Sequence, residues 1–140
     1  MIYDLSNSIG FTIARTQGKL RNVMIRKFRE FDLTPNQWAV LNYLSIDYGI
    51  PPTEISKITF KDIPNTIRIL QKLEKKGLVC HHINPDDKRV SLFYLSDKGY
   101  NLRDELFPIG TSVMEQAVKD IDPEKVKELI DLLNKIYDNL

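Results

Sequence analysis

The sequence has one cysteine in 140 residues and no long apolar run. A single thiol cannot form an internal disulfide, so the chain does not resemble a disulfide-stabilised secreted domain. No run of about 18 apolar residues predicts a transmembrane span. The first residues lack the basic and apolar regions of a signal peptide. These absences predict a cytoplasmic protein with no membrane partner.

Signatures of catalysis are also missing. The sequence has no glycine-rich phosphate loop and no H-E-x-x-H pair of metal ligands. His81 and His82 are neighbours in a predicted strand, so their side chains point to opposite faces and cannot share a metal ion. Cys80 beside them has no partners at metal-binding spacing and is interpreted as a small half-buried residue. The sequence therefore predicts no enzyme, no metal site and no cofactor.

The net charge of +1 hides an uneven distribution. Residues 1–52 carry six Lys and Arg against four Asp and Glu, residues 53–92 carry eight against five, and residues 93–140 carry six against ten. Cations therefore concentrate in the middle of the chain and acids at its C-terminal end. This is a modest cationic footprint for nucleic acid, so non-specific DNA binding is expected to be weak and to depend strongly on salt.

The same cationic segment predicts two short helices. Residues 53–58 form an amphipathic turn of helix with a Thr cap, and residues 59–61 form a break. A second helix over 63–76 begins at the N-cap Asp62 and ends at Gly77, which supplies a left-handed C-cap. This second helix is the segment around which the other predicted elements are arranged.

Helical periodicity gives the 63–76 helix two different faces. The inward face holds Ile63, Thr66, Ile67, Leu70 and Leu73. The outward face has amides and cations but no acid, and comprises Pro64, Asn65, Arg68, Gln71, Lys72 and Lys75. Asn and Arg near a helix N-terminus can make bidentate contacts to adenine or guanine in the major groove. An ordinary solvated helix face is the alternative interpretation.

A β-hairpin follows this helix after a few residues. Strand-like segments at 78–83 and 89–95 flank a charged turn at 84–88. Lys88 and Arg89 suit a phosphate backbone or a minor groove, and Asp87 is placed to hold the guanidinium of Arg89. An isolated turn of this composition is usually only a turn. Here the order helix, turn, helix, hairpin is that of a winged helix-turn-helix.

Four motifs make the sequence similar to the MarR family, the multiple-antibiotic-resistance-type regulators. They occur in the family's order and spacing over residues 33–99, and they are Leu33-Thr34-Pro35-Asn36-Gln37-Trp38-Ala39-Val40-Leu41, Leu70-Gln71-Lys72-Leu73-Glu74-Lys75-Lys76-Gly77-Leu78-Val79, Asp87-Lys88-Arg89 and Leu95-Ser96-Asp97-Lys98-Gly99. The sequence departs from the family where His81 and His82 stand in place of an Arg. It also departs at Pro64 and Ile67, which replace small polar residues.

Long helices are predicted on both sides of these motifs. Residues 4–31 form one helix, and a capping box at 34–37 begins the next, with Trp38 in the core. Ile50 precedes two prolines and is a candidate for a short third strand. Ser96 caps a helix to about residue 119, with a kink or break near Phe107 because Pro108 and Gly110 follow. The last helix repeats apolar residues at steps of three and four: Val126, Leu129, Ile130, Leu133, Ile136, Tyr137 and Leu140.

The predicted fold is mainly α with a small β-hairpin wing, a winged helix-turn-helix with long N- and C-terminal dimerisation helices. Its predicted domains are a dimerisation helix at 1–31, a DNA-binding lobe at 32–95 and dimerisation helices at 96–140. The resemblance implies a homodimeric transcriptional repressor that reads a palindromic operator in double-stranded DNA with helix 63–76 and wing 84–89. It also implies release by a small aromatic effector.

The candidate DNA contacts are Lys61, Pro64, Asn65, Thr66, Arg68, Lys72, Asp87, Lys88 and Arg89. Thr66 reaches DNA only if the helix is rotated from the periodicity estimate. The alternative function is a winged-helix module for protein interaction without a DNA role. The outward face of the helix argues against that alternative because it carries no aromatic side chain.

Overall fold

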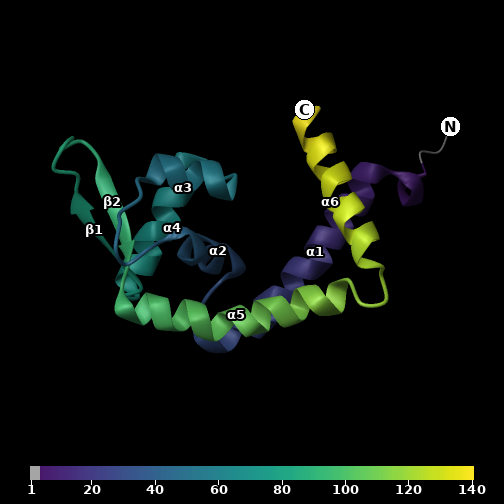
Figure 1. The fold of residues 1–140 in the computed structure, drawn as a ribbon, viewed down its shortest axis with the longest axis horizontal. Coiled ribbons are helices and arrows are strands. Elements are labelled where there is room, and N and C mark those ends of the chain that lie inside the picture. The colour runs from purple at the N-terminus through teal and green to yellow at the C-terminus, as the bar shows by residue number, and fades with distance from the viewer. Residues whose placement is uncertain (1–3) are drawn as a thin grey trace.

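The computed structural model describes residues 4–140, which form six α-helices, two short 3-10 helices and one antiparallel hairpin (Figure 1). The winged lobe lies at one end and consists of α2 (Pro35–Tyr43), α3 (Pro52–Thr59), α4 (Ile63–Lys75), β1 (Val79–Ile83) and β2 (Ser91–Leu95). From this lobe α5 (Asp97–Ala117) runs beside α1 (Ile9–Phe28) to α6 (Pro123–Asp138) at the opposite end. The predicted fold class is confirmed.

One hydrophobic core joins the winged lobe to α1 and α5. Its fully buried side chains come from five helices and include Phe28, Leu41, Ile55, Leu70, Leu73 and Leu106. The last helix, α6, contributes no buried residue. Within residues 4–140 no helix is long and apolar enough to cross a membrane. The core therefore holds α4 in place, whereas α6 contacts the lobe only at its surface, through the ring of Tyr137 on that of Phe60.

The first helix is shorter than predicted. Asp4 accepts a hydrogen bond from the backbone N–H of Ser6 and starts a 3-10 helix, η1 (Leu5–Asn7). Ser8 then adopts an extended conformation and caps α1 with its side chain. These short polar side chains compete for backbone groups and interrupt the helix. At the other end, η2 (Arg29–Phe31) ends at Asp32 in the left-handed conformation.

The start of α2 has the predicted capping box. Thr34 Oγ1 accepts the N–H of Gln37 at 3.1 Å, and Gln37 Oε1 accepts the N–H of Thr34 at 3.2 Å. The predicted Thr cap on the next helix is wrong, because α3 begins one residue earlier with Pro51 as N-cap and no side-chain hydrogen bond. A proline in the first helical turn loses no intrahelical hydrogen bond and presets φ, so the helix starts without a polar cap.

A kink or break was predicted near Phe107; the fifth helix is continuous from Asp97 to Ala117, so the break is wrong. The φ of Pro108 is compatible with a helix, and only the hydrogen bond to the carbonyl four residues earlier is lost. Gly110 has a packing role. A Cβ added there would lie 2.7 Å from the ring of Trp38, so the glycine lets α5 approach that ring closely. Trp38 itself packs on Phe28 at 5.2 Å between ring centroids, as a core residue does.

The hairpin pairs β1 with β2 in an antiparallel register from Val79 opposite Leu95 to Ile83 opposite Ser91. The predicted third strand is present as one bridge between Ile50 and Phe93. Both strands begin one or two residues later than predicted. The charged turn thereby extends to Val90, whose carbonyl accepts the N–H of Asn84 at 2.8 Å.

Candidate DNA-binding surface

The recognition helix α4 buries a face slightly different from the predicted one. Thr66, Leu70 and Leu73 are buried, as periodicity indicates. Ile63 and Ile67, predicted to point inward, are 43% and 37% exposed. Ile69 packs against the core instead. The buried face of α4 is therefore rotated toward Ile69 relative to the predicted face. As a result, Ile63 and Ile67 remain on the surface.

Thr66 is corrected as a DNA-contacting candidate. Its side chain is fully buried, and its hydroxyl donates a hydrogen bond to the backbone carbonyl of Asp62 at 2.9 Å. A buried hydroxyl needs such a partner, and the carbonyl one turn earlier supplies it. Thr66 therefore stabilises the first turn of α4 from inside the lobe.

A chain of hydrogen bonds organises the exposed polar residues at the start of α4. Asp62 accepts the backbone N–H and the side-chain amide of Asn65, both at 2.7 Å. The guanidinium of Arg68 donates to the amide oxygen of Asn65. These contacts hold the Arg68 and Asn65 side chains beside each other on the surface before any partner binds. Their remaining donors and acceptors suit the edges of base pairs.

Cations flank this polar pair. Lys61, Arg68 and Lys72 line one hollow between α4 and the start of α2, opposite Thr34 and Asn36. Lys61 precedes the helix, and Lys72 lies one turn beyond Arg68. The hollow is therefore positively charged and lies next to the candidate base-reading residues. Pro64 is exposed in the first turn of the same helix.

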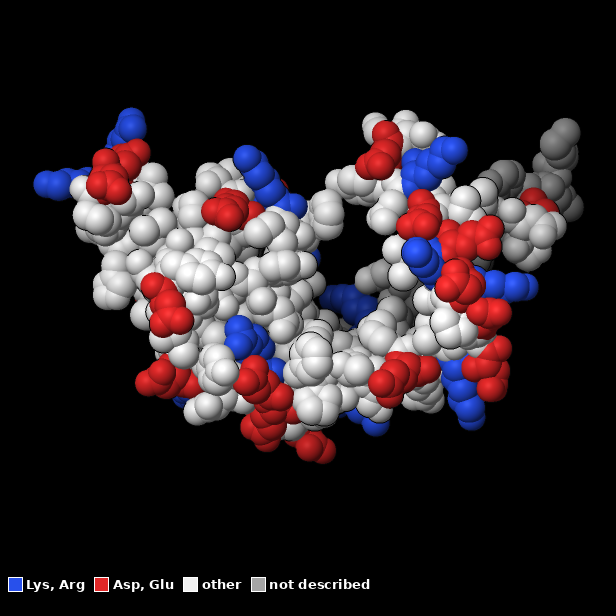
Figure 2. Space-filling view, viewed as in Figure 1, with Lys and Arg blue, Asp and Glu red and all other residues white. Residues whose placement is uncertain are grey.

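The wing tip has a fixed guanidinium. Asp87 accepts Nε of Arg89 at 3.1 Å and Nη2 at 3.2 Å, and also its backbone N–H at 3.1 Å. The side-chain hydrogen bond from Arg89, followed by the backbone one, holds the pKa of the Asp87 carboxyl below its usual value. The Arg89 side chain is 91% exposed. Figure 2 shows Lys and Arg side chains projecting from the hairpin tip beside acidic ones, and acids outnumbering cations over α6.

Replacing Arg89 with Ala is expected to weaken DNA binding severalfold and to leave the melting temperature within about 2 °C of the wild type, because the side chain is exposed. Asp87→Ala is expected to weaken binding less, since it frees the guanidinium without removing it. Fluorescence anisotropy and thermal melts on both variants test this. A large fall in melting temperature for either variant would show that the pair holds the fold instead.

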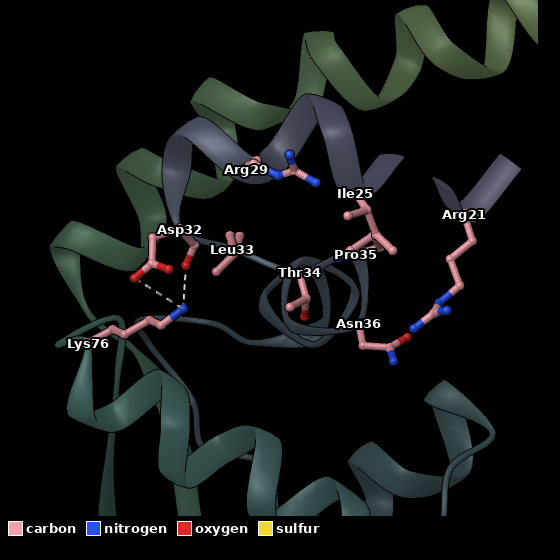
Figure 3. A pocket seen from close by; sticks show the side chains of 9 residues that line it. All are labelled: Arg21, Ile25, Arg29, Asp32, Leu33, Thr34, Pro35, Asn36 and Lys76. Atoms are coloured by element: carbon pink, nitrogen blue, oxygen red, sulfur yellow. Dashed lines mark hydrogen bonds and ion pairs between the residues drawn. The ribbon is translucent and has the colours of Figure 1, made fainter. Parts of the chain in front are cut away.

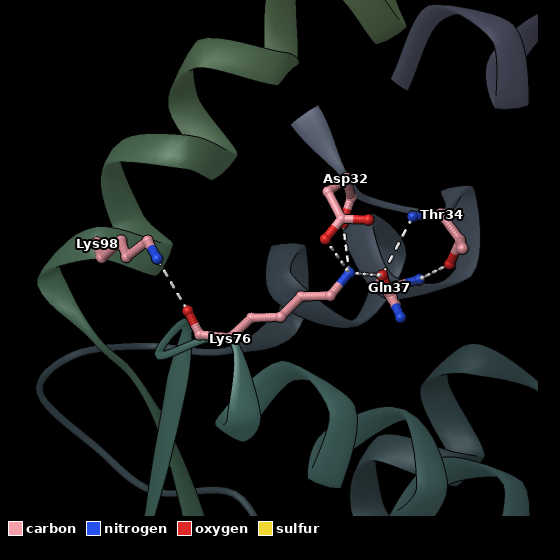
Figure 4. Close-up of polar contacts among 5 residues, drawn as sticks. All are labelled: Asp32, Thr34, Gln37, Lys76 and Lys98. Atoms are coloured by element: carbon pink, nitrogen blue, oxygen red, sulfur yellow. Dashed lines mark hydrogen bonds and ion pairs between the residues drawn. The ribbon is translucent and has the colours of Figure 1, made fainter. Parts of the chain in front are cut away.

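Lys76, which was not among the predicted site residues, connects the end of α4 to the segment before α2, to α2 itself and to α5. Lys76 follows α4 and donates to the backbone carbonyl of Asp32 and, at 3.2 Å, to Oε1 of the buried Gln37 (Figure 4). Its own carbonyl accepts Nζ of Lys98 at 3.0 Å. Asp32 is 44 residues away in sequence, so periodicity carried no signal for this contact.

The same lysine lines a hollow between the end of α1 and the start of α2. Figure 3 shows the cations of Arg21, Arg29 and Lys76 around the apolar side chains of Ile25, Leu33 and Pro35. The carboxylate of Asp32 also faces it and lies 3.7 Å from Nζ of Lys76. The hollow thus combines apolar walls with cationic groups and touches the end of the recognition helix.

Comparison with known proteins decides the family. The family model described as MarR family matches residues 31–90. The uncharacterized HTH-type transcriptional regulator YkoM of Bacillus subtilis is 30% identical over 114 residues, which cover 79% of this chain and 72% of YkoM. The chain belongs to the MarR family. It is thus a DNA-binding transcriptional regulator of the winged-helix type and not an enzyme, as predicted.

Solved structures of MarR-type regulators have the same fold. The S. aureus MepR–DNA complex superposes with a TM-score of 0.89 at 21% identity, covering 95% of this chain and 98% of that one. Bordetella bronchiseptica BpsR, whose DNA binding is regulated by 6-hydroxynicotinic acid, superposes with a TM-score of 0.90 at 21% identity, covering 99% of each chain. These structures show the shared fold, and it is membership in a family of DNA-binding regulators that sets aside the winged-helix module without a DNA role.

Proposed function

We propose that this MarR-family chain is a cytoplasmic homodimeric repressor that reads a palindromic operator in double-stranded DNA. The observation that carries the proposal is the surface of α4, where Asn65 and Arg68 are exposed, held together by hydrogen bonds and flanked by cations. Each subunit places α4 in a major groove and the 84–89 wing beside it. Repression then follows because the bound dimer occludes the promoter.

The residues have separate roles on the DNA. Asn65 and Arg68 read base edges. Pro64 packs against the DNA beside these two side chains. Lys61, Lys72 and Lys88 contact phosphates, which position the protein without reading sequence. Arg89, oriented by Asp87, enters the minor groove. In a two-fold dimer the two recognition helices read half-sites about 10 bp apart.

The dimer is built from residues 1–31 and 96–140, around the lobe at 32–95. Support comes from α6, most of whose apolar side chains remain exposed in one protomer. Leu129, Ile130, Leu132 and Tyr137 are each at least half exposed, and Leu133 is 39% exposed. Further apolar exposure lies at Ile9 and Phe11 of α1. Soluble monomers rarely leave so continuous an apolar surface in water, so a second copy is the natural cover.

Replacing Arg68 with Ala is expected to weaken operator binding by about 1–3 kcal/mol and to relax the preference at one base pair in each half-site. The operator is first obtained by selection from a random DNA pool, and single-base variants are then titrated with both proteins. Arg15→Ala is the matched control, because it removes the same charge from the exposed surface of α1. Equal weakening on every sequence would show that Arg68 touches phosphate only.

We further propose that a small aromatic acid releases the DNA by binding in the hollow of Figure 3. The cations of Arg21, Arg29 and Lys76 suit a carboxylate, and the apolar side chains suit a ring. A carboxylate bound there competes with Asp32 and Gln37 for the ammonium of Lys76. The competition disturbs the end of α4, and the recognition helix is thereby coupled to the effector.

Adding salicylate or 6-hydroxynicotinate to the protein–operator complex is expected to raise the apparent dissociation constant by about tenfold, within the usual range of allosteric coupling. Anisotropy titrations at fixed ionic strength measure this, with benzamide as the uncharged control. The Arg21→Ala variant is expected to bind the operator normally and to respond less to the acids. An identical response in Arg21→Ala would place the effector elsewhere.

A further inference from the structure

The recognition helix carries an exposed apolar edge that its core contacts do not use. Ile63 and Ile67 lie one helical turn apart and are 43% and 37% exposed, and Pro64 beside them is exposed as well. The inward side of α4 is already filled by Thr66, Leu70 and Leu73. The edge occupies the N-terminal half of the helix, which is the half that contacts base edges in helix-turn-helix proteins.

The charged residues on the same surface of α4 restrict the chemistry of a partner that binds this edge. Lys61, Arg68 and Lys72 line the hollow on the Ile69 side of α4, whereas the apolar edge lies on the other side of the same exposed surface, and no aromatic side chain lies on the helix. The acid at the start of the helix, Asp62, is occupied as the N-cap by Asn65. An exposed surface that is apolar on one side and cationic on the other suits an anionic partner that displays small apolar groups between its charges. The major groove of DNA is such a surface, because the C5-methyl group of each thymine projects into it between two phosphate backbones.

We propose that Ile63, Pro64 and Ile67 read thymine methyl groups in each half-site of the operator. The inference rests on the proposed function, since it requires α4 to lie in a major groove. Ile67 lies one position before Arg68 and about 100° around the helix from it, so the methyl contact and the Arg68 contact fall on different bases. Isoleucine has no donor or acceptor and distinguishes thymine from cytosine by the methyl group alone.

The test replaces thymines with deoxyuridine one at a time in an operator selected from a random DNA pool. Deoxyuridine keeps every hydrogen bond of the base pair and removes only the methyl group. At a contacted position the wild-type protein is expected to bind about fourfold more weakly, as expected for one methyl group returned to water. Deoxyuridine in the flanking DNA is expected to have no effect and serves as the internal control.

The variants locate the contact on the protein. Ile67→Ala is expected to weaken binding to the unmodified operator and to lose the response to deoxyuridine at one position, while Ile63→Ala loses it at a neighbouring position. Ile46→Ala is the matched control, because Ile46 is 41% exposed and lies outside the recognition helix. If an alanine variant fails to fold, the matching valine variant, which removes a single methyl group, is titrated in its place.

Two results overturn the inference while leaving the proposed function intact. One is a selected operator on which every single deoxyuridine substitution binds as tightly as thymine. The other is a deoxyuridine effect that stays equally large in Ile67→Ala and Ile63→Ala, which would place the methyl contacts on other residues. A random pool that yields no preferred sequence would instead contradict the proposed function itself, and the thymine contacts with it.

Discussion

The Leu133→Asp variant is expected to lose operator binding completely at micromolar concentration, although Arg68 and Arg89 remain intact. Leu133 lies in the apolar stripe of α6, a helix that buries no residue within one protomer. If a second copy covers this stripe, the substitution buries an unpaired carboxylate at the interface, at a cost of several kcal/mol. A monomer then reads one half-site and loses half of the contacts.

The measurement is sedimentation of both proteins, followed by binding isotherms on the same operator. Asn134→Asp is the matched control, because it places the same acid on the polar side of the same helix. That variant is expected to sediment and bind like the wild type. A Leu133→Asp protein that still sediments as a dimer and binds normally would show that the stripe is not the interface.

Gly99→Ala is expected to lower the stability of the protein by about 3 kcal/mol or more, a fall in melting temperature of about 10 °C. A Cβ at this position would lie 2.0 Å from the backbone oxygen of Leu78, which also accepts the N–H of Ser96 at 3.0 Å. The hydrogen bond to Ser96 holds the Leu78 carbonyl in place, so moving it away from the added Cβ costs free energy. The wing and the start of α5 are therefore forced apart at the point where they join.

Gly18→Ala is the control for the helix itself. Gly18 lies in α1 with no atom within 4 Å of an added Cβ, so the substitution gains helix propensity without a clash. Its melting temperature is expected to rise by a few degrees or to stay unchanged. Equal behaviour of the two variants in thermal melts would show that the contact with Leu78 does not constrain α5.

The element order was predictable because each helix and turn of the lobe carries local signals. The capping box at Thr34 and Gln37, the N-cap at Asp62 and the left-handed Gly77 all lie where the sequence places them. These signals depend on residues only a few positions apart, so they can be recognised without knowledge of the tertiary structure. The hairpin is predicted for the same reason, since its charged turn separates two strand-like runs.

The face of α4 was harder to predict, because five isoleucine and leucine residues compete for one side of a short helix. Periodicity assigned Ile63 and Ile67 inward, whereas the core takes Ile69. That choice depends on α2, α3 and β1, which pack on α4, and on no property of the helix alone. Lys76 was missed for a related reason: its partners Asp32 and Gln37 are remote in sequence. Contacts between residues so far apart in sequence cannot be predicted until the tertiary structure is known.

The central claim is that two copies of this chain read one operator through paired recognition helices. It is tested most directly by the stoichiometry and spacing dependence of binding, measured by sedimentation of a labelled operator selected from random DNA. We expect two subunits per operator and a loss of tight binding when about 5 bp are inserted between the half-sites, because half a helical turn places them on opposite faces of the duplex. One subunit per operator, or equal affinity for both spacings, would contradict it.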